Sequence, residues 1–320
     1  MRTTSDAIVE GVYNPKKIPG LVLDSIRRRS GIKAFGIRGP AIKAAEARYR
    51  LKSYPYDETS IWDQEWDLLV ILDACRPEWL QHEAKNHPQL GDVKTVHSVG
   101  SHSKEWIDAT FDEEYAEELS ETLYVTGNHY ANRIDRSLLG GFETAHDYGE
   151  WAYEAAAPPA HVITDLAISA ARESAWDRCI VHYMQPHKPF LERGGSREEY
   201  DVIPWSIGYE PYRRVLKGNL AIEDLHAAFK NNLQYVLSEV KTLLKNINAR
   251  KTVITADHGQ ALGEDGLWDH AVGVNHPSMR CVPWVETTAK DQHTHTPKAY
   301  KHTNYDYSIV ENNLEDLGYL

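Results

Sequence analysis

The chain has little cysteine and no long apolar run. Its three cysteines, Cys75, Cys179 and Cys281, are odd in number and far apart among 320 residues. This spacing excludes a disulfide scaffold and a zinc module built on cysteine pairs, and a reducing cytoplasm is the simplest compartment for such a chain. No run of about 18 apolar residues is present, so the sequence predicts no transmembrane helix. The first ten residues also lack the apolar segment of a secretory signal, and we therefore expect a cytoplasmic protein.

Basic residues are concentrated at the start of an otherwise acidic chain. The whole chain holds 35 Lys or Arg against 47 Asp or Glu, a formal charge of −12, whereas residues 1–56 hold twelve basic and four acidic residues. Such an asymmetry is typical of contact with anionic lipid or nucleic acid, or of a solvated basic arm that lies on the protein's own acidic surface. The apolar residues Leu21–Leu23 and Ile26 stand beside three arginines and favour a small amphipathic anchor. No nucleic-acid-binding motif accompanies the basic residues, so we expect peripheral contact with an anionic membrane or an internal strap.

Continuous apolar runs alternate with amphipathic ones beyond residue 60. Runs rich in Val, Ile and Leu predict strands buried in a parallel sheet, at Trp66–Asp73, Val93–His97, Leu123–Thr126, Arg178–Tyr183 and Thr252–Ala256. Helical patterns predict helices between them, from Pro77, over Ser103–Tyr115, over 160–175 and over 221–247. Strands that alternate with helices indicate an α/β fold, with a doubly wound, mostly parallel sheet and helices on both faces.

Two stretches fall outside this alternation. Residues 1–60 are broken by several prolines and a glycine, and we expect short helices that lie on the main body. Residues 191–219 contain Gly, Pro and aromatic residues without a period, which predicts a long functional loop. The predicted organisation is therefore a basic N-terminal extension over 1–60 and one α/β domain over 61–320.

Polar side chains follow three of the predicted strands. Asp73 ends the first, His187 follows the fourth, and Asp257 with His258 follows the fifth. Ligands of doubly wound sheets bind beyond the carboxyl ends of the strands, so these side chains are expected to meet there. Two carboxylates and an imidazole are ample ligands for a divalent ion, and such oxygen and nitrogen donors suit Mn²⁺, Mg²⁺ or Zn²⁺. A single Asp after a strand is also a common helix cap, but the three segments together favour a metal site.

A group of serines precedes the predicted helix at 103. Ser98, Ser101 and Ser103 lie within six residues. A helix N-terminus presents free N–H groups and partial positive charge, which favour a bound anion. A serine there that touches a metal ion could lose its proton and attack phosphorus. The alternative is that Ser101 and Ser103 only cap the helix.

Four blocks of sequence together carry a recognisable pattern. They are Leu69–Arg76, Gly100–Trp106, His182–Phe190, and Thr255–Gly259 with Gly263, Glu264, Gly266, His270 and Val282–Trp284 behind it. In this order and spacing, from about residue 66 to the end, they resemble the alkaline phosphatase and sulfatase superfamily, and most of all its sulfatase-like branch. The blocks are similar to the first strand with its metal-ligand Asp, the nucleophile turn, the His-x-Pro-aromatic segment and the Asp-His-Gly metal block. The ending, Val310–Leu320, is also similar to many sulfatase-type C-termini.

The resemblance implies an alkaline-phosphatase-like fold and a metal-dependent phosphoester hydrolase or phosphotransferase. The implied metal ligands are Asp73, Ser101, Asp257 and His258, with Mn²⁺ favoured and Mg²⁺, Zn²⁺ or Ca²⁺ as alternatives. The implied substrate is a small-molecule phosphoester or one linked to a lipid or glycan.

The resemblance also implies a hydroxyl nucleophile. In phosphoglycerol transferases and phosphodiesterases of the superfamily, the first residue of a Thr-Ser-Asp-x-Glu-Phe pattern attacks. Setting Glu105 and Trp106 against Glu-Phe places the nucleophile at Ser101, with Ser103 as the alternative nucleophile. His187 and His270 are then expected to stabilise the transferring phosphoryl group.

Two features depart from the family patterns. Sulfatases require Cys or Ser in Cys/Ser-x-Pro-x-Arg, whereas Cys75–Trp79 has Trp where Arg is needed and directly follows the first strand. A sulfatase-type sulfoester hydrolase is therefore kept as an alternative, beside a non-catalytic sulfatase-like binding protein. Two-metal members have further Asp and His ligands. His161 and Asp165, at helical spacing, are the candidate counterpart, and His270 is a candidate for a second ion or for the phosphate; we expect one ion.

Overall fold

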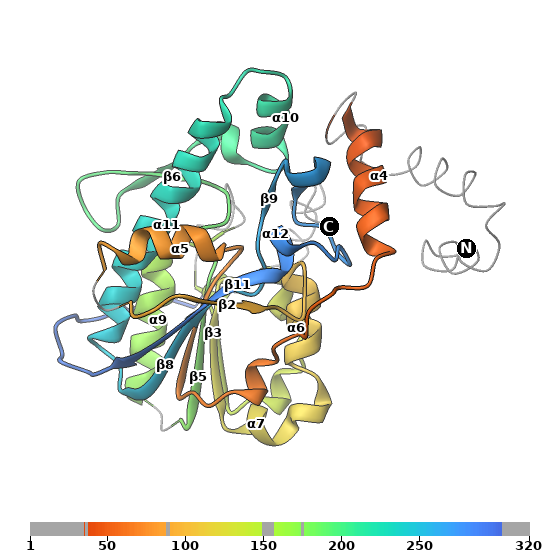
Figure 1. Cartoon of the computed structure of the whole chain (residues 1–320). Coiled ribbons are helices and arrows are strands. Elements are labelled where there is room, and N and C mark those ends of the chain that lie inside the picture. The colour runs from red at the N-terminus through yellow and green to blue at the C-terminus, as the bar shows by residue number, and fades with distance from the viewer. Residues whose placement is uncertain (1–34, 36–37, 88–89, 149–156, 174–175, 303–320) are drawn as a thin grey trace.

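The computed structural model describes residues 35, 38–87, 90–148, 157–173 and 176–302. In this part of the chain a seven-stranded sheet forms the centre of the molecule (Figure 1). Its strands are, in spatial order, β2 (Lys94–His97), β11 (Cys281–Ala289), β8 (Ala249–Thr255), β1 (Leu68–Leu72), β5 (Arg178–Tyr183), β3 (Thr122–Thr126) and β4 (Gly141–Thr144). Strand β11 runs antiparallel to both of its neighbours, and the other pairs are parallel. The predicted α/β fold with a mostly parallel sheet is confirmed.

Strand β1 lies at the middle of the sheet because all five of its residues are apolar. Each of them is buried, and the strand pairs with β5 on one side and β8 on the other. Side chains alternate between the two faces of a strand. Leu68, Val70 and Leu72 accordingly belong to one apolar cluster, and Leu69 and Ile71 belong to another. A strand of this kind needs helices on both faces of the sheet.

Helices cover both faces of the sheet (Figure 1). On one face lie α5 (Pro77–Ala84), α9 (Ala160–Glu173) and α11 (Ile222–Leu244), and on the other lie α6 (Ser103–Thr110) and α7 (Ala116–Ser120). The remaining α-helices of the described part are α4 (Gly39–Arg50), α10 (Glu210–Leu216) and α12 (Pro277–Arg280). Short 3₁₀ turns are η3 (Ile61–Asp63), η4 (Glu113–Tyr115), η5 (His129–Arg133), η6 (Arg136–Leu138), η7 (Ala145–Asp147), η8 (Pro204–Ser206) and η9 (Glu264–Gly266).

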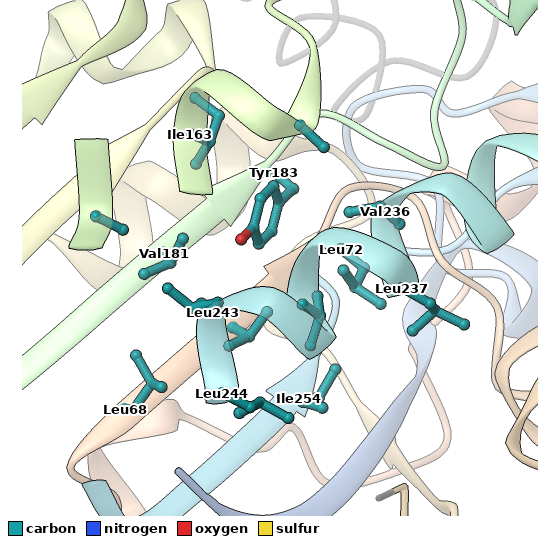
Figure 2. Close-up of a cluster of buried hydrophobic side chains, with 14 of the residues drawn as sticks. Leu68, Leu72, Ile163, Val181, Tyr183, Val236, Leu237, Leu243, Leu244 and Ile254 are labelled. Carbon is teal, nitrogen blue, oxygen red and sulfur yellow. The ribbon is translucent and has the colours of Figure 1, made fainter. Parts of the chain in front are cut away.

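Figure 2 shows how α11 closes one face of the sheet. Val236, Leu237, Leu243 and Leu244 of this helix lie against strand residues such as Ile254, in a cluster that is fully buried or nearly so. The apolar stripe predicted for residues 221–247 is therefore the buried face of the helix. At about 25 cal/mol per Å² of apolar surface, such a face contributes several kcal/mol to folding.

Two predicted elements need correction, and two strands of the sheet were not predicted. Residues 191–219 are not a structureless loop: they contain a hairpin of β6 (Leu191–Arg193) and β7 (Tyr200–Val202), then η8 and α10. The helix predicted over Ser103–Tyr115 ends at Thr110, and η4 follows it. Strands β4 and β11 were not expected, since β4 is short and β11 contains Pro283, which argues against a strand inside a sheet. A further small hairpin joins β9 (Ala261–Leu262) to β10 (Trp268–Asp269).

The described part of the N-terminal extension packs on the main body. Helix α4 inserts Tyr49 into a small apolar cluster with Leu267 and Met279, and the backbone oxygen of Tyr49 accepts a hydrogen bond from the N–H of Asn275. Phe35 and Ile42 lie in another buried cluster with residues of α10 and α11. The basic residues of 1–34 and the ending 310–320 lie outside the described residues. Among the helices described here, none has the length and apolar character needed to cross a bilayer.

Candidate active site

The carboxyl ends of β1 and β8 bring two carboxylates and an imidazole together. Asp73 follows β1, and Asp257 and His258 follow β8, which is its direct neighbour in the sheet. One potential ligand atom from each residue lies within 4.8 Å of the others, and all three residues are buried. The structure therefore brings together three of the four residues predicted as metal ligands.

Backbone geometry aims the two carboxylates at one another. Ala74, directly after Asp73, has a φ of 60°, a left-handed conformation that costs a residue with a Cβ about 1 kcal/mol or more. In this conformation the N–H of Ala74 donates to Oδ1 of Asp257 (3.2 Å), which also accepts the N–H of His258 (2.9 Å). The strained turn thus holds Asp257 against Asp73.

The Nε2 atom of His258 faces the two carboxylates. Its Nδ1 lies 2.7 Å from the carbonyl oxygen of Gly259, so Nδ1 carries the proton and donates it. Nε2 then presents a lone pair 3.5 Å from Oδ1 of Asp73 and 3.4 Å from Oδ2 of Asp257. A backbone carbonyl that fixes the tautomer in this way is the usual companion of a metal-binding histidine.

The two carboxylates fit a divalent cation because each is buried with an oxygen that has no hydrogen-bond donor. Oδ1 of Asp73 and Oδ2 of Asp257 are these atoms, and an unsatisfied buried carboxylate oxygen is costly. Burial, with the Asp257 charge beside it, raises the pKa of Asp73 well above its ordinary value. Burial would also raise the pKa of Asp257, but His258 and His182 outweigh it and lower that pKa. A cation between the two oxygens would satisfy both.

The hydroxyl of Ser103 lies in this cluster. Ser103 Oγ is 3.4 Å from Oδ2 of Asp73 and 3.2 Å from Nε2 of His258. Ser103 is the first residue of α6, and the N-cap is His102, whose Nδ1 accepts the N–H of Lys104 (3.0 Å). The interpretation of Ser103 as a cap is therefore wrong, because its side chain turns away from the helix backbone toward the carboxylates.

The hydroxyl of Ser101 is placed elsewhere. It lies 2.7 Å from Oε2 of Glu105 and 2.9 Å from the carbonyl oxygen of Ala271, and it accepts the N–H of Val274 (3.1 Å). None of these partners is a predicted metal ligand. Ser101 joins the start of α6 to the segment behind His270, so its described contacts are structural.

A second group of polar side chains adjoins the first. His187, Asp269 and His270 also place one ligand atom each within 4.8 Å of one another. His187 follows the carboxyl end of β5, and Asp269 and His270 lie at the end of the β9–β10 hairpin. Nδ1 of His270 is 2.8 Å from Oδ1 of Asp269. The structure thus brings His187 and His270 together, as expected from the sequence.

Histidine rings connect the two groups. The ring of His270 is stacked on His258 with 4.5 Å between centroids, and it lies 4.7 Å from His102 and 4.8 Å from His187. Burial is the main cause that lowers the pKa of His270 to about 4, and it holds the pKa values of His102 and His187 well below the ordinary range. At neutral pH these three imidazoles are therefore uncharged and available for proton transfer and hydrogen bonding.

Several residues of the site were not found from the sequence. Nδ2 of Asn128 donates to Oδ2 of Asp73 (3.3 Å), and Asn128 lies two residues beyond the carboxyl end of β3. The strand-end rule that selected Asp73 would have found it. Lys188 and Asp269 were also missed, although each stands directly beside a selected histidine. His102 has no signal of its own, because its role depends on where α6 begins.

Other sequence candidates have different surroundings. His182 is fully buried, with Nε2 3.7 Å from Oδ2 of Asp257 and Nδ1 3.0 Å from the hydroxyl of Tyr124. His182 therefore lies beside Asp257 inside the sheet, and its Nε2 forms no hydrogen bond there with the described residues. Cys75 belongs to the apolar core, where burial raises the pKa of its thiol. A buried, protonated thiol is a poor nucleophile, which argues against a sulfatase-type role.

His161 and Asp165 on α9 take part in a separate polar network. Nδ1 of His161 lies 3.0 Å from the hydroxyl of Tyr235. Asp165 forms an ion pair with Arg197 (2.9 Å) and lies 2.7 Å from Nε2 of His295. These partners link α9 to the β6–β7 hairpin and to the segment after β11, so the described contacts of the pair are structural.

Comparison with known proteins confirms the fold. No family model and no curated protein matches the chain. The integral membrane protein lipooligosaccharide phosphoethanolamine transferase A from Neisseria meningitidis has a similar structure, with a TM-score of 0.50 and 12% identity over 96% of this chain and 61% of that chain. The soluble domain of that transferase gives a TM-score of 0.47 at 12% identity, over 80% of this chain and 83% of the domain.

A protein in the alkaline phosphatase superfamily from Vibrio parahaemolyticus is also similar, with a TM-score of 0.38 and 11% identity over 90% of this chain and 78% of that one. At this level of identity the comparisons show the fold alone. The α/β fold that the four sequence blocks implied is confirmed at that level.

Proposed function

We propose that this chain is a metal-dependent phosphoester hydrolase or phosphotransferase whose nucleophile is Ser103. The observation that carries the proposal is the position of the Ser103 hydroxyl, 3.4 Å from Oδ2 of Asp73 and 3.2 Å from Nε2 of His258, at the amino end of α6. The two carboxylates favour a cation and the helix terminus favours an anion. The Ser103 hydroxyl lies between these two places, so it would be next to both the metal ion and the phosphoryl group of the substrate.

Four residues of the chain would hold the metal ion: Asp73, Ser103, Asp257 and His258. This set differs from the sequence prediction only in the serine. When bound, a divalent ion such as Mn²⁺ supplies a Lewis acid that favours loss of the serine proton and polarises a phosphoryl oxygen. Asn128 and His182 would keep the two carboxylates in position through their contacts with Asp73 and Asp257.

The reaction itself would take place at Ser103. Its Oγ forms a bond to phosphorus while the bond from phosphorus to the leaving alcohol breaks, and the alcohol departs with the proton that the serine gave up. Water or a second alcohol then attacks the phosphorus atom of the phosphoserine, the bond from phosphorus to Oγ breaks, and Oγ takes up the proton that the attacking group gives up. The identity of this acceptor decides between hydrolase and transferase.

His187 and His270 would bind the phosphoryl group. Nζ of Lys188 lies 3.4 Å from Nε2 of His187, which assigns the proton of His187 to Nδ1, where it can be donated to a phosphoryl oxygen. Asp269 stands 2.8 Å from Nδ1 of His270 and would stabilise that imidazole when it takes up a proton on Nε2. His270 is then able to hold a proton next to the anionic substrate.

Chromogenic esters test the proposed reaction. We expect p-nitrophenyl phosphate or bis-p-nitrophenyl phosphate to be cleaved in the presence of Mn²⁺ and not after chelation, with little cleavage of p-nitrophenyl sulfate. Faster cleavage of the sulfate ester would support the sulfatase alternative. Full Mn²⁺ binding without cleavage of any of the three esters would support a non-catalytic binding protein.

The basic start of the chain supports a second part of the proposal, a lipid-linked substrate at an anionic membrane. Residues 1–34 hold seven Lys or Arg and three Asp or Glu. At the end of α4 the side chain of Leu51 is 75% exposed between Arg50 and Lys52. The transferase from Neisseria, which is similar in fold, is named for a lipooligosaccharide and is an integral membrane protein. Each basic residue at an anionic surface contributes about 1 kcal/mol.

Vesicle sedimentation tests this contact. We expect the chain to bind vesicles that contain phosphatidylserine, to ignore vesicles of phosphatidylcholine alone, and to lose affinity as salt rises, since the attraction is screened. Deletion of residues 1–34 should abolish binding without unfolding the protein, because Phe35, Ile42 and Tyr49, which pack in the core, are kept. If the intact chain fails to bind anionic vesicles at low salt, residues 1–34 do not contact a membrane, and the alternative that they lie on the protein's own acidic surface is favoured.

A further inference from the structure

A lysine side chain lies within the second group of polar residues. The side chain of Lys188 is 1% exposed, and its Nζ atom is 3.2 Å from each carboxylate oxygen of Asp269. The same atom is 3.4 Å from Nε2 of His187. The buried ammonium group of Lys188 therefore contacts His187 and Asp269, two of the three residues whose ligand atoms lie close enough together to hold a metal ion.

Asp269 is built to face a cation. It has a left-handed φ of 67°, and its Oδ1 accepts hydrogen bonds from the hydroxyl of Tyr212 (3.1 Å) and from Nε2 of Gln260 (3.2 Å). Lys188, His270 and His187 hold the pKa of Asp269 well below its ordinary value against the effect of burial. The carboxylate is therefore charged and fixed in place, and its nearest cation is Lys188.

We propose that the Lys188 ammonium group is a built-in cation that takes the place of a second metal ion between His187, Asp269 and His270. This inference rests on the proposed function, because it takes the first ion to bind at Asp73, Ser103, Asp257 and His258. The ammonium charge would then stabilise the charge of the phosphoryl group without a second metal ion.

Electrostatics explains why the ammonium group excludes a second ion. A divalent ion at the cluster would face a positive charge within a few ångströms in a buried site, where charges interact far more strongly than in water. Displacing Lys188 instead would separate its buried ammonium group from the carboxylate of Asp269, and breaking a buried ion pair is strongly destabilising. Lys188 is also near enough to favour the ionised form of Asp73. Its charge therefore acts on the group of Asp73, Asp257 and His258 as well as on the group of His187, Asp269 and His270.

Metal content per chain tests the role of Lys188 without an activity measurement. Protein loaded with Mn²⁺ and then desalted should contain one ion per chain in the wild type and two in Lys188→Ala. The double variant Lys188→Ala/Asp269→Asn should return to one, because the second ion then lacks its carboxylate. Lys104→Ala, which removes a half-exposed lysine at the start of α6, is the matched control and should keep one.

Two results would overturn this role of Lys188. One is a wild-type chain with two ions, seen also as the electron paramagnetic resonance signal of a coupled Mn²⁺ pair; this measurement needs no variant, so it decides the matter even if Lys188→Ala does not fold. The other is a Lys188→Ala protein with native circular dichroism that still binds a single ion. A wild-type chain that binds no ion would instead contradict the proposed function itself.

Discussion

Replacement of Ser103 by alanine should lower metal-dependent phosphoester turnover by about 10⁴-fold or more, the size of effect seen when a covalent nucleophile is removed from a hydrolase. The physical reason is that the Ser103 hydroxyl lies beside Asp73 and His258 and is the atom that would bond to phosphorus. Metal content should change little, because two carboxylates and an imidazole are left. Steady-state kinetics with bis-p-nitrophenyl phosphate, together with metal analysis, checks both expectations.

Ser101→Ala is the matched control, since it removes the same group two residues away. Its hydroxyl contacts Glu105, Ala271 and Val274, and loss of these bonds should cost about 1–3 kcal/mol of unfolding free energy. Turnover at a temperature where the protein is folded should fall far less than in Ser103→Ala. An inactive Ser101→Ala together with an active Ser103→Ala would show that the nucleophile is Ser101 and not Ser103.

Replacement of Asp257 by alanine should bring bound metal to background. The carboxylate is fully buried between Asp73, His258 and His182 and has an oxygen without a donor. Its loss removes one of the two carboxylates of this group. Metal content measured by mass spectrometry should therefore fall to the level of a chelated sample.

Thermal unfolding provides a second readout for Asp257→Ala. An ion present at 100 times its Kd stabilises the folded wild type by about 2.7 kcal/mol, so Mn²⁺ should raise its Tm by several degrees. The variant should show no rise. Glu286→Ala is the control: Glu286 is exposed and pairs with Lys94 at the surface, so the Mn²⁺ response should be kept. Full metal content in Asp257→Ala would place the ion somewhere else.

The proximity of Asp73, Asp257 and His258 could be predicted from the sequence because their positions depend on strands. The apolar runs before Asp73 and Asp257 predict buried strands, and the carboxyl ends of neighbouring parallel strands meet at one edge of a sheet. The order and spacing of the four blocks led to the same residues. Asp73, Asp257 and His258 consequently lie together in the structure.

The serine could not be assigned in the same way. Ser98, Ser101 and Ser103 are close in sequence, and the choice among them depends on the residue at which α6 begins. The helix is capped by His102, a weaker sequence signal for a cap than serine. This places Ser103 inside the first turn, with its hydroxyl toward the carboxylates.

The second polar group depends on contacts that are distant in sequence. Asp269 meets Lys188 and Tyr212 through the β9–β10 hairpin and α10, and none of these elements has a strong hydrophobic period. The left-handed φ of Asp269 could not be predicted either, because Asp adopts this conformation more readily than most residues but does not require it. Similarly, β11 contains Pro283 and was hidden by it.

The claim that Ser103 is the nucleophile is tested most directly by finding which residue carries the phosphoryl group during turnover. Protein quenched in acid while it cleaves bis-p-nitrophenyl phosphate with Mn²⁺ can be digested with trypsin, which releases residues 95–104, a peptide that contains Ser98, Ser101 and Ser103. Tandem mass spectrometry then identifies the modified residue. We predict a phosphoryl group on Ser103 that is absent after chelation of the metal. A phosphoryl group on Ser101 or Ser98, or rapid turnover that never labels this peptide, would contradict the account.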